Sequence, residues 1–197
     1  AGIWARQFYQ KGDQVVLLKA QTGDHLFVDR LTYNFRKPAR GDIFVFATAG
    51  TAIQQQDQFY IKRLVGLPNE TLSVVKEFDN ERVPGFGTVP VGHLVVDGRA
   101  LSASTPHFEN VYSFPDAIRG QQNFNYHENH YTGHAQLGGL SSGSQMHVSD
   151  KHYFAMGDNT LNSADSRYWG DVPEQNVIGK SFFVYWPITS RFGWGHR

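Results

Sequence analysis

The sequence contains no cysteine among its 197 residues. This absence excludes a disulfide scaffold, a thiolate metal site and a cysteine nucleophile together. It leaves the cellular compartment open, because a chain without cysteine is stable in oxidising and in reducing surroundings.

An excess of charge of one sign is also absent. Lys and Arg total 18 and Asp and Glu total 18, so the formal net charge is zero. A nucleic-acid-binding domain is expected to be basic, and we therefore predict no nucleic-acid partner. Charged residues make up 18% of the chain and aromatic residues 14%, with 20 glycines, which favours β-structure with many turns over a helical bundle.

Long apolar runs are missing as well. The longest, residues 15–18 and 43–46, are far shorter than the roughly 20 residues of a membrane-spanning helix. The sequence begins with Ala1 and has no basic segment followed by an apolar one, as a signal peptide would. We expect the natural polypeptide to extend upstream of Ala1.

Short β-type stretches separated by turns make up most of the chain. They are residues 15–18, 25–30, 43–46, 59–65, 71–76, 89–96, 153–156 and 181–186, with a tight turn at Asp97-Gly98. Residues 102–150 are rich in Ser, Gly, Asn, Gln and His and are typical of loops. The sequence predicts a mainly β fold: an antiparallel core from residues 1–75 and 151–197, interrupted by an inserted β and loop region at 76–150.

Three histidines of the loop-rich region invite a metal hypothesis. His127, His130 and His134 have the spacing of ligands on one face of a helix. The residues between them are poor helix formers, and Glu128 is the sole carboxylate among them. We therefore expect a polar surface loop here, and neither a metal nor a cofactor.

The apolar run 59–65 contains two adjacent cations, Lys62 and Arg63. On a strand they point to opposite faces, so one of them is expected to face the interior or a cleft. A desolvated lysine has its pKa lowered from about 10.4, and the neutral amine is then a competent general base near neutral pH. The alternative is an edge-strand lysine whose ammonium group lies in water.

The sequence around Lys62 resembles that of the type I signal peptidases, membrane-bound serine proteases with a Ser/Lys dyad. Three blocks carry the resemblance: GDHLFV (23–28) with RGDIFVF (40–46), YIKRLVGLP (60–68), and MGDNTLNSADSRYWG (156–170). Their order and spacing also agree with the family, and the last block matches almost residue for residue. The resemblance implies the β core with a variable inserted region.

The resemblance also implies roles for individual residues. Lys62 would be the general base and Ser163 would orient its amine, while Asp165 and Arg167 would form a structural ion pair. The remaining residues of the block would support the adjacent loop: Gly157, Asp158, Asn159 and Ser166. The implied partners are the signal peptides of exported preproteins and, through an upstream anchor, the bacterial cytoplasmic membrane, with the catalytic domain on its outer, periplasmic face.

The nucleophile of the family is missing from this sequence. Where the family has Ser-x-Met-x-Pro-Thr-Leu before a Gly-Asp pair, residues 15–20 read VVLLKA, and the first serine is Ser73. One interpretation is that the nucleophilic serine lies upstream of this chain, so that the chain alone is inactive. The other is a non-catalytic homologue that serves as a binding or assembly module for exported polypeptides.

Overall fold

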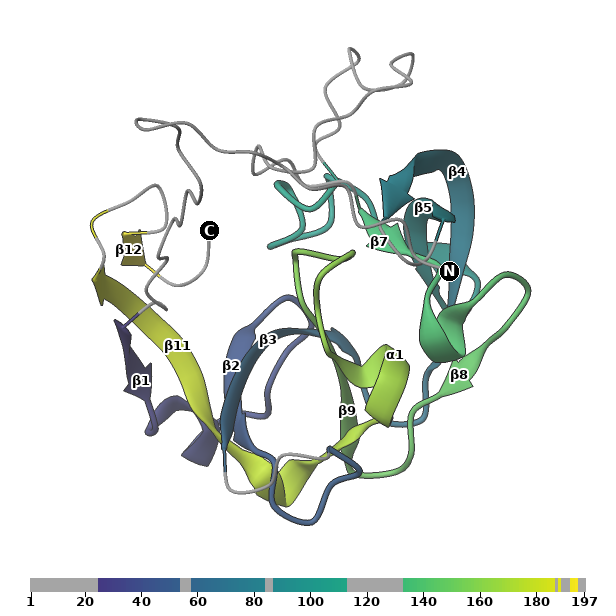
Figure 1. Cartoon of the computed structure of the whole chain (residues 1–197). Coiled ribbons are helices and arrows are strands. Elements are labelled where there is room, and N and C mark those ends of the chain that lie inside the picture. The colour runs from purple at the N-terminus through teal and green to yellow at the C-terminus, as the bar shows by residue number, and fades with distance from the viewer. Residues whose placement is uncertain are drawn as a thin grey trace, which may run out of the picture.

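The computed structural model describes residues 25–53, 58–83, 87–112, 133–186, 188 and 192–194. They form two sheets, and every strand pairing in both sheets is antiparallel (Figure 1). This confirms the predicted mainly β, antiparallel fold class. The predicted strand at 15–18 lies outside the described residues.

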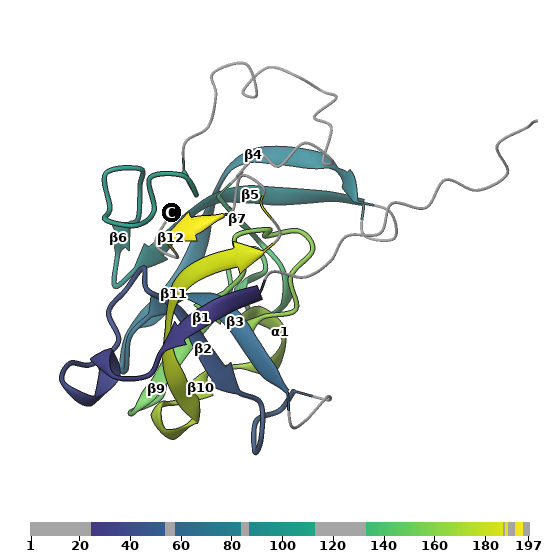
Figure 2. The same cartoon turned by 90° about the vertical axis from the view of Figure 1, so that its left-hand side faces the viewer.

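The first sheet is built from both ends of the chain. Its strands are β1 (His25–Asp29), β2 (Ile43–Ala47), β3 (Phe59–Gly66), β9 (His152–Met156), β10 (Val172–Pro173), β11 (Val177–Trp186) and β12 (Gly193–Trp194). Their order is β1-β11-β2-β3-β9-β10, with β12 paired to β11. Figure 2 shows β1 and β11 side by side at the front of this sheet.

The second sheet is built from the middle of the chain. Its strands are β4 (Thr71–Val83), β5 (Gly87–Val96), β6 (Arg99–Ala100), β7 (His134–Ala135) and β8 (Met146–His147), in the order β6-β5-β4-β8 with β7 on β5. This sheet begins at Thr71 and overlaps the insertion expected at 76–150, while the division into domains stays a prediction. The tight turn at Asp97-Gly98 is confirmed, because both residues have positive φ, 46° and 79°, as a type I′ hairpin turn requires.

Short helical turns join the strands. They are η1 (Thr32–Asn34), η2 (Gly138–Leu140), η3 (Glu174–Asn176) and α1 (Ser166–Trp169). The carboxylate of Asp165 caps α1 by accepting the backbone N–H of Arg167.

Three apolar clusters lie in the described part of the chain. One is formed within the first sheet by side chains such as Phe44, Phe46 and Tyr153. A second is smaller and lies between β5 and β7 of the second sheet. The third joins the sheets, because Phe154 and Met156 of β9 pack in one cluster with Leu72 of β4 and Leu94 of β5. The second sheet is therefore fixed to the first by continuous burial of apolar surface.

Strand β3 lies inside the first sheet and not at its edge. It pairs with β2 on one side, where Lys62 is opposite Phe44, and with β9 on the other, where Arg63 is opposite Met156. The interpretation of Lys62 as an edge-strand lysine is therefore wrong.

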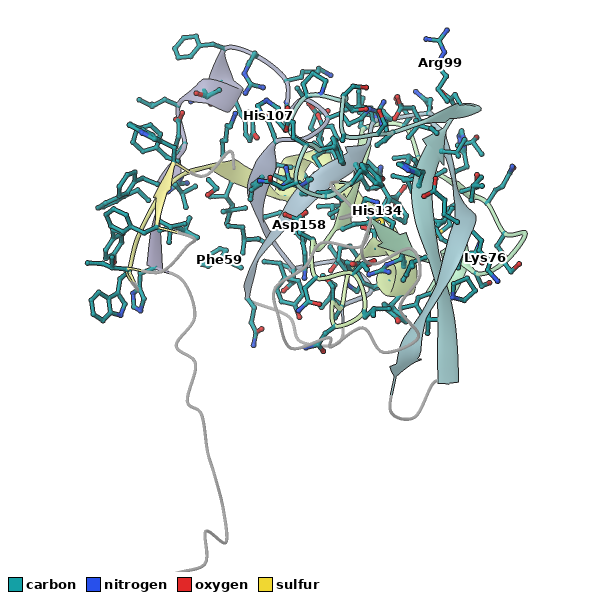
Figure 3. The ribbon with its side chains drawn as sticks, turned by 90° about the horizontal axis from the view of Figure 1, so that it is seen from above. Phe59, Lys76, Arg99, His107, His134 and Asp158 are labelled. Carbon is teal, nitrogen blue, oxygen red and sulfur yellow. The ribbon has the colours of Figure 1, made fainter. Side chains whose placement is uncertain are left out.

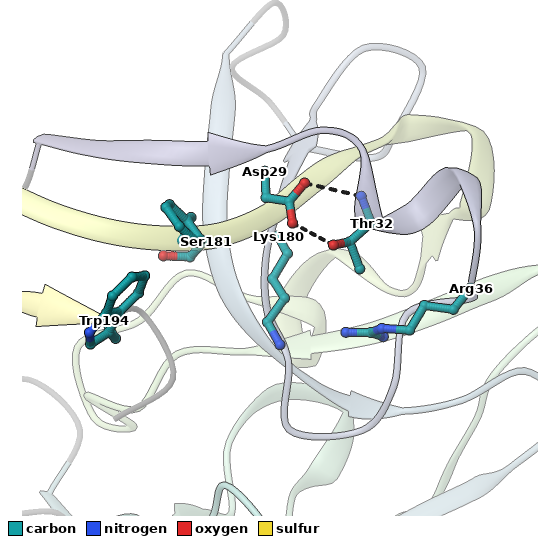
Figure 4. Close-up of a pocket in the computed structure, with 7 residues that line it drawn as sticks. Asp29, Thr32, Arg36, Lys180, Ser181 and Trp194 are labelled. Carbon is teal, nitrogen blue, oxygen red and sulfur yellow. Dashed lines mark hydrogen bonds between the residues drawn. The ribbon is translucent and has the colours of Figure 1, made fainter.

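A shallow hollow lies beside β1 and β11 (Figure 4). Its lining residues are Asp29, Thr32, Arg36, Lys180, Ser181, Phe182 and Trp194. The Asp29 carboxylate accepts hydrogen bonds from the backbone N–H and the hydroxyl of Thr32. Arg36 and Lys180 both bind the carboxylate of Asp42. Because its charged groups are already paired, and because neither Lys62 nor Ser163 lines it, we assign the hollow no function.

Asp42 ties this side of the first sheet together. Its buried carboxylate accepts Arg36 Nη1 at 2.9 Å, Lys180 Nζ at 2.7 Å and the backbone N–H of Ala39 at 3.1 Å. Burial acts to raise the pKa of Asp42, but these bonds outweigh it and lower the pKa to about 2. The ionised carboxylate is therefore the form that stabilises the fold.

We predict that Asp42→Asn lowers the free energy of unfolding at pH 7 by on the order of 2 kcal/mol. Because the folded pKa of Asp42 lies below that of the unfolded chain, this stabilisation is complete above about pH 4 and is lost as the pH falls toward 2. Denaturant unfolding across this range measures the difference between the variant and the unchanged protein. The exposed Asp150→Asn serves as control, and a difference that does not shrink toward pH 2 would contradict the prediction.

Candidate functional site

The side chains of Lys62 and Ser163 meet between β3 and the segment that follows β9. Lys62 Nζ lies 2.9 Å from Ser163 Oγ, although the two residues are 101 positions apart in the sequence. Gly157 makes room for this contact, since a Cβ at position 157 would lie 2.8 Å from Ser163 Cβ and 3.4 Å from Lys62 Nζ. A glycine is needed there because any larger residue would push the two side chains apart.

Asp165 lies behind Ser163 and is fully buried. Its carboxylate accepts Arg167 Nε at 2.8 Å, Arg167 Nη2 at 2.7 Å and the backbone N–H of Gly157 at 3.1 Å, and it also binds the Ser163 hydroxyl. Burial acts to raise the pKa of Asp165, but the bonds from Arg167 and its positive charge outweigh it, and the net change is a lowering. The ion pair expected between Asp165 and Arg167 is thus present.

Arg167 uses all five of its guanidinium N–H groups. Besides the two bonds to Asp165, Nη1 donates to Thr160 Oγ1 at 3.0 Å and to the Ala135 carbonyl at 3.2 Å, and Nη2 donates to the Thr160 carbonyl at 2.7 Å. The guanidinium group is completely buried, so each of these bonds replaces one that water would supply.

These contacts fix the direction of the bond between Lys62 and Ser163. The ionised carboxylate of Asp165 can only accept, so the hydroxyl proton of Ser163 is directed to Asp165. Ser163 Oγ then accepts a hydrogen from Lys62 Nζ. The lone pair of a neutral Lys62 amine consequently points away from Ser163.

The surroundings lower the pKa of the Lys62 amine. Burial is the largest cause that lowers its pKa, and the positive charge of Arg167 adds to it. The negative charges of Asp165 and Asp158 act in the opposite direction, but the net change is a lowering. A half-buried amine with a lowered pKa is suited to accept a proton from a reacting group.

Arg63 and Asp158 form a second ion pair next to this site. Arg63 Nε and Nη2 each lie 2.7 Å from one oxygen of the Asp158 carboxylate, and Nη1 donates to the carbonyls of Gly41 and His107. The sequence interpretation gave Asp158 only a loop-shaping role and did not pair it. An arginine that is buried needs a carboxylate partner, so the sequence could have indicated that Arg63 forms an ion pair.

The other predicted supporting residues lie around this centre. Ser166 Oγ accepts the backbone N–H of Ala155 at 2.9 Å, and the carbonyl of Asn159 accepts the backbone N–H of Asn162 at 3.1 Å. These bonds shape the segment between β9 and α1 without contact to Lys62. Lys62, Gly157, Ser163 and Asp165 are therefore the predicted residues that the structure brings together most closely.

His134 does not lie on a polar surface loop, and that expectation is wrong. It is 1% exposed on β7, and its Nδ1 lies 2.6 Å from the hydroxyl of Tyr112. Burial lowers the pKa of His134 to about 3, so the ring is neutral.

In Figure 3, His134 and Asp158 lie toward the middle of the view, whereas Lys76 and Arg99 lie at its edge. His127 and His130 lie outside the described residues.

Two features are absent from the part of the chain that the structure describes. No three His, Asp or Glu side chains gather there as a metal-binding set. None of the helices in these ranges is long and apolar enough to cross a membrane.

Comparisons with known proteins agree on one family. The sequence model of the family described as "Signal peptidase, peptidase S26" matches residues 17–186. A signal peptidase I of Leptolyngbya laminosa is 30% identical over 172 residues, covering 86% of this chain and 63% of that protein. A signal peptidase I of Pseudomonas aeruginosa is 28% identical, covering 85% of this chain and 61% of that protein.

A solved signal peptidase I structure from Enterococcus faecalis is 26% identical with a TM-score of 0.41, covering 74% of this chain and 97% of that one. The chain spans 63%, 57% and 61% of the length of three curated relatives that it matches.

We predict that the Lys62 amine loses its proton at a pH below the ordinary lysine value of 10.5, because burial disfavours the charged form. The ¹³Cε chemical shift of Lys62, followed by NMR as a function of pH, measures this transition, and Lys62→Arg identifies its signal. A transition at or above the ordinary value would contradict the prediction.

Proposed function

Because the chain belongs to the signal peptidase family, peptidase S26, we propose that it is the base-carrying part of a serine endopeptidase that removes signal peptides from exported preproteins. The single observation that carries this proposal is the half-buried Lys62 amine, 2.9 Å from Ser163 Oγ, with its lone pair left for a reacting group.

In this proposal Lys62 is the general base. Its neutral amine takes the proton of a serine hydroxyl as that oxygen attacks the scissile carbonyl, and the resulting ammonium group gives the proton to the leaving amine. Water then attacks the acyl-enzyme carbonyl while Lys62 accepts a proton from that water. The bond between the acyl carbon and the serine oxygen breaks, and Lys62 returns the proton to the serine oxygen. The serine is supplied by a segment outside these 197 residues, since residues 15–20 read VVLLKA and no serine precedes Ser73.

Ser163 orients the base and takes no proton in this scheme. Its hydroxyl proton is held by Asp165, and Asp165 is held by Arg167, so the oxygen that faces Lys62 has a fixed position. A base held in place loses less conformational freedom in the transition state. Asp158 supports the site through Arg63, the neighbour of Lys62 on β3.

The proposed substrate is an extended peptide, and the proposed location is the outer face of the bacterial cytoplasmic membrane. An upstream anchor would hold the catalytic part at the surface, beside its substrate.

One observation favours a second candidate function. The stretch 15–20 lacks the serine of the family pattern, so a non-catalytic homologue that binds exported polypeptides would also fit the sequence. That candidate requires no proton transfer at Lys62. A substitution of Lys62 would therefore abolish cleavage under the first function and have no catalytic effect under the second.

The test uses the natural polypeptide isolated from its source cells, with its intact mass and N-terminal sequence determined first. We expect a product larger than 22.2 kDa that carries a serine segment and cleaves a preprotein at its signal peptide. Lys62→Ala should abolish cleavage, because no base remains. Ser163→Ala should reduce kcat by about 10²-fold while leaving the base itself in place.

Cleavage is followed by mass spectrometry of both products, and near-ultraviolet circular dichroism checks that each variant is folded. Lys37→Ala serves as the matched control, because this lysine is exposed and pairs with Glu174, which is not a residue of the site. Full turnover by folded Lys62→Ala would overturn the assignment of the base. A natural product without a serine segment, unable to cleave but able to bind preproteins, would establish the second candidate.

A further inference from the structure

The segment between β9 and α1 contacts both sheets. Figure 1 shows α1 beside β9 of the first sheet. The turn η2 contacts α1 and also β4 of the second sheet. Gly138 of η2 lies directly against Arg167: a Cβ at position 138 would be 2.8 Å from the Arg167 carbonyl carbon. The turn η2, which lies between β7 and β8 of the second sheet, therefore packs against the residue that holds Asp165.

Thr160 makes the polar part of this contact. Its side chain is 3% exposed, and its Oγ1 accepts the backbone N–H of Ala135 at 2.8 Å and Arg167 Nη1 at 3.0 Å. Ala135 belongs to β7, where it pairs with Val91 of β5. One hydroxyl oxygen thus joins a strand of the second sheet to the guanidinium group of the site.

A continuous series of contacts leads from this hydroxyl to the base. Arg167 binds Asp165 through two bonds, Asp165 binds the Ser163 hydroxyl, and Ser163 Oγ lies 2.9 Å from Lys62 Nζ. Each partner along the way is buried or half-buried, so the bonds do not compete freely with water.

We propose that Thr160 is a positioning residue, through which the second sheet holds the Arg167–Asp165 pair and thereby the Ser163 hydroxyl that orients Lys62. The second sheet is then part of the support of the base. This inference rests on the proposed role of Lys62, but its test measures the amine itself and does not require cleavage.

Removing the hydroxyl has a defined physical consequence. The Ala135 N–H and one Arg167 N–H would both lose a buried acceptor, and each needs a new partner, from water or from a shifted neighbour. Either change loosens Asp165 and Ser163 and admits water toward Lys62. Better hydration favours the charged amine, so its proton would be lost only at higher pH.

The experiment compares Thr160→Val, which keeps the shape but lacks the hydroxyl, with Thr160→Ser, which keeps the hydroxyl. In this chain, NMR of the Lys62 ¹³Cε signal gives the pH at which the amine loses its proton. We expect Thr160→Val to raise this pH by about one unit and Thr160→Ser to leave it within about 0.3 units of the unchanged protein.

Val148→Ala is the matched control, because it removes buried apolar volume from the core that joins the sheets without touching Thr160 or Lys62. It should lower stability and leave the Lys62 transition unchanged. If Thr160→Val does not fold, Thr160→Ala replaces it. An unchanged transition in a folded variant without the hydroxyl, or an equal shift in Val148→Ala, overturns the proposal.

The outcome is separable from that of the proposed function. Cleavage retained in Lys62→Ala would remove the catalytic assignment, while a shift of the Lys62 transition in Thr160→Val would still show the coupling. Conversely, an unchanged transition in Thr160→Val removes the positioning role and leaves Lys62 as the proposed base.

Discussion

The buried guanidinium group of Arg167 determines how the candidate site can be built. A fully buried positive charge is tolerated only when it is paired and when its N–H groups are bonded. Asp165 supplies the charge, and Thr160 and Ala135 supply the remaining acceptors. These partners come from the segment after β9 and from β7. The hydrogen bonds of the Arg167 guanidinium group therefore require the two sheets to take one fixed arrangement around Lys62.

The adjacent cations of β3 illustrate how a strand can place two charges in different surroundings. Alternation sends Lys62 and Arg63 to opposite faces. Arg63 is 3% exposed and keeps its charge through a bidentate bond to Asp158. Among the described residues, Lys62 has the Ser163 hydroxyl at hydrogen-bond distance and no carboxylate in a direct ion pair that would hold its amine in the charged form. The same β-strand therefore carries a permanent cation and an amine whose protonation can change.

The sequence alone predicts the antiparallel β class, the strands around Lys62 and the Asp97-Gly98 turn, because alternation and turn residues are local properties. The meeting of Lys62 with Ser163 came from the resemblance of two blocks to a family and not from spacing, since 101 residues separate them. The Arg63–Asp158 pair and the burial of His134 were missed. Both depend on partners brought close by the tertiary fold, Asp158 for one and Tyr112 for the other. The adjacent cations of β3 indicate that a buried arginine needs a carboxylate, but no local pattern shows which carboxylate it is.

The balance of charge around Lys62 explains why its pKa lies below the ordinary lysine value. The two nearest carboxylates, Asp158 and Asp165, are each engaged by a guanidinium group through two bonds. Their negative charge is therefore largely offset before it acts on Lys62, and Arg167 adds repulsion. A proton on Lys62 would add a positive charge that has no direct carboxylate partner in the described part of the chain to a partly buried site, which is unfavourable. The two ion pairs thus make the site rigid. Because their carboxylates are already paired, they do not stabilise the charged form of Lys62 as a free carboxylate would.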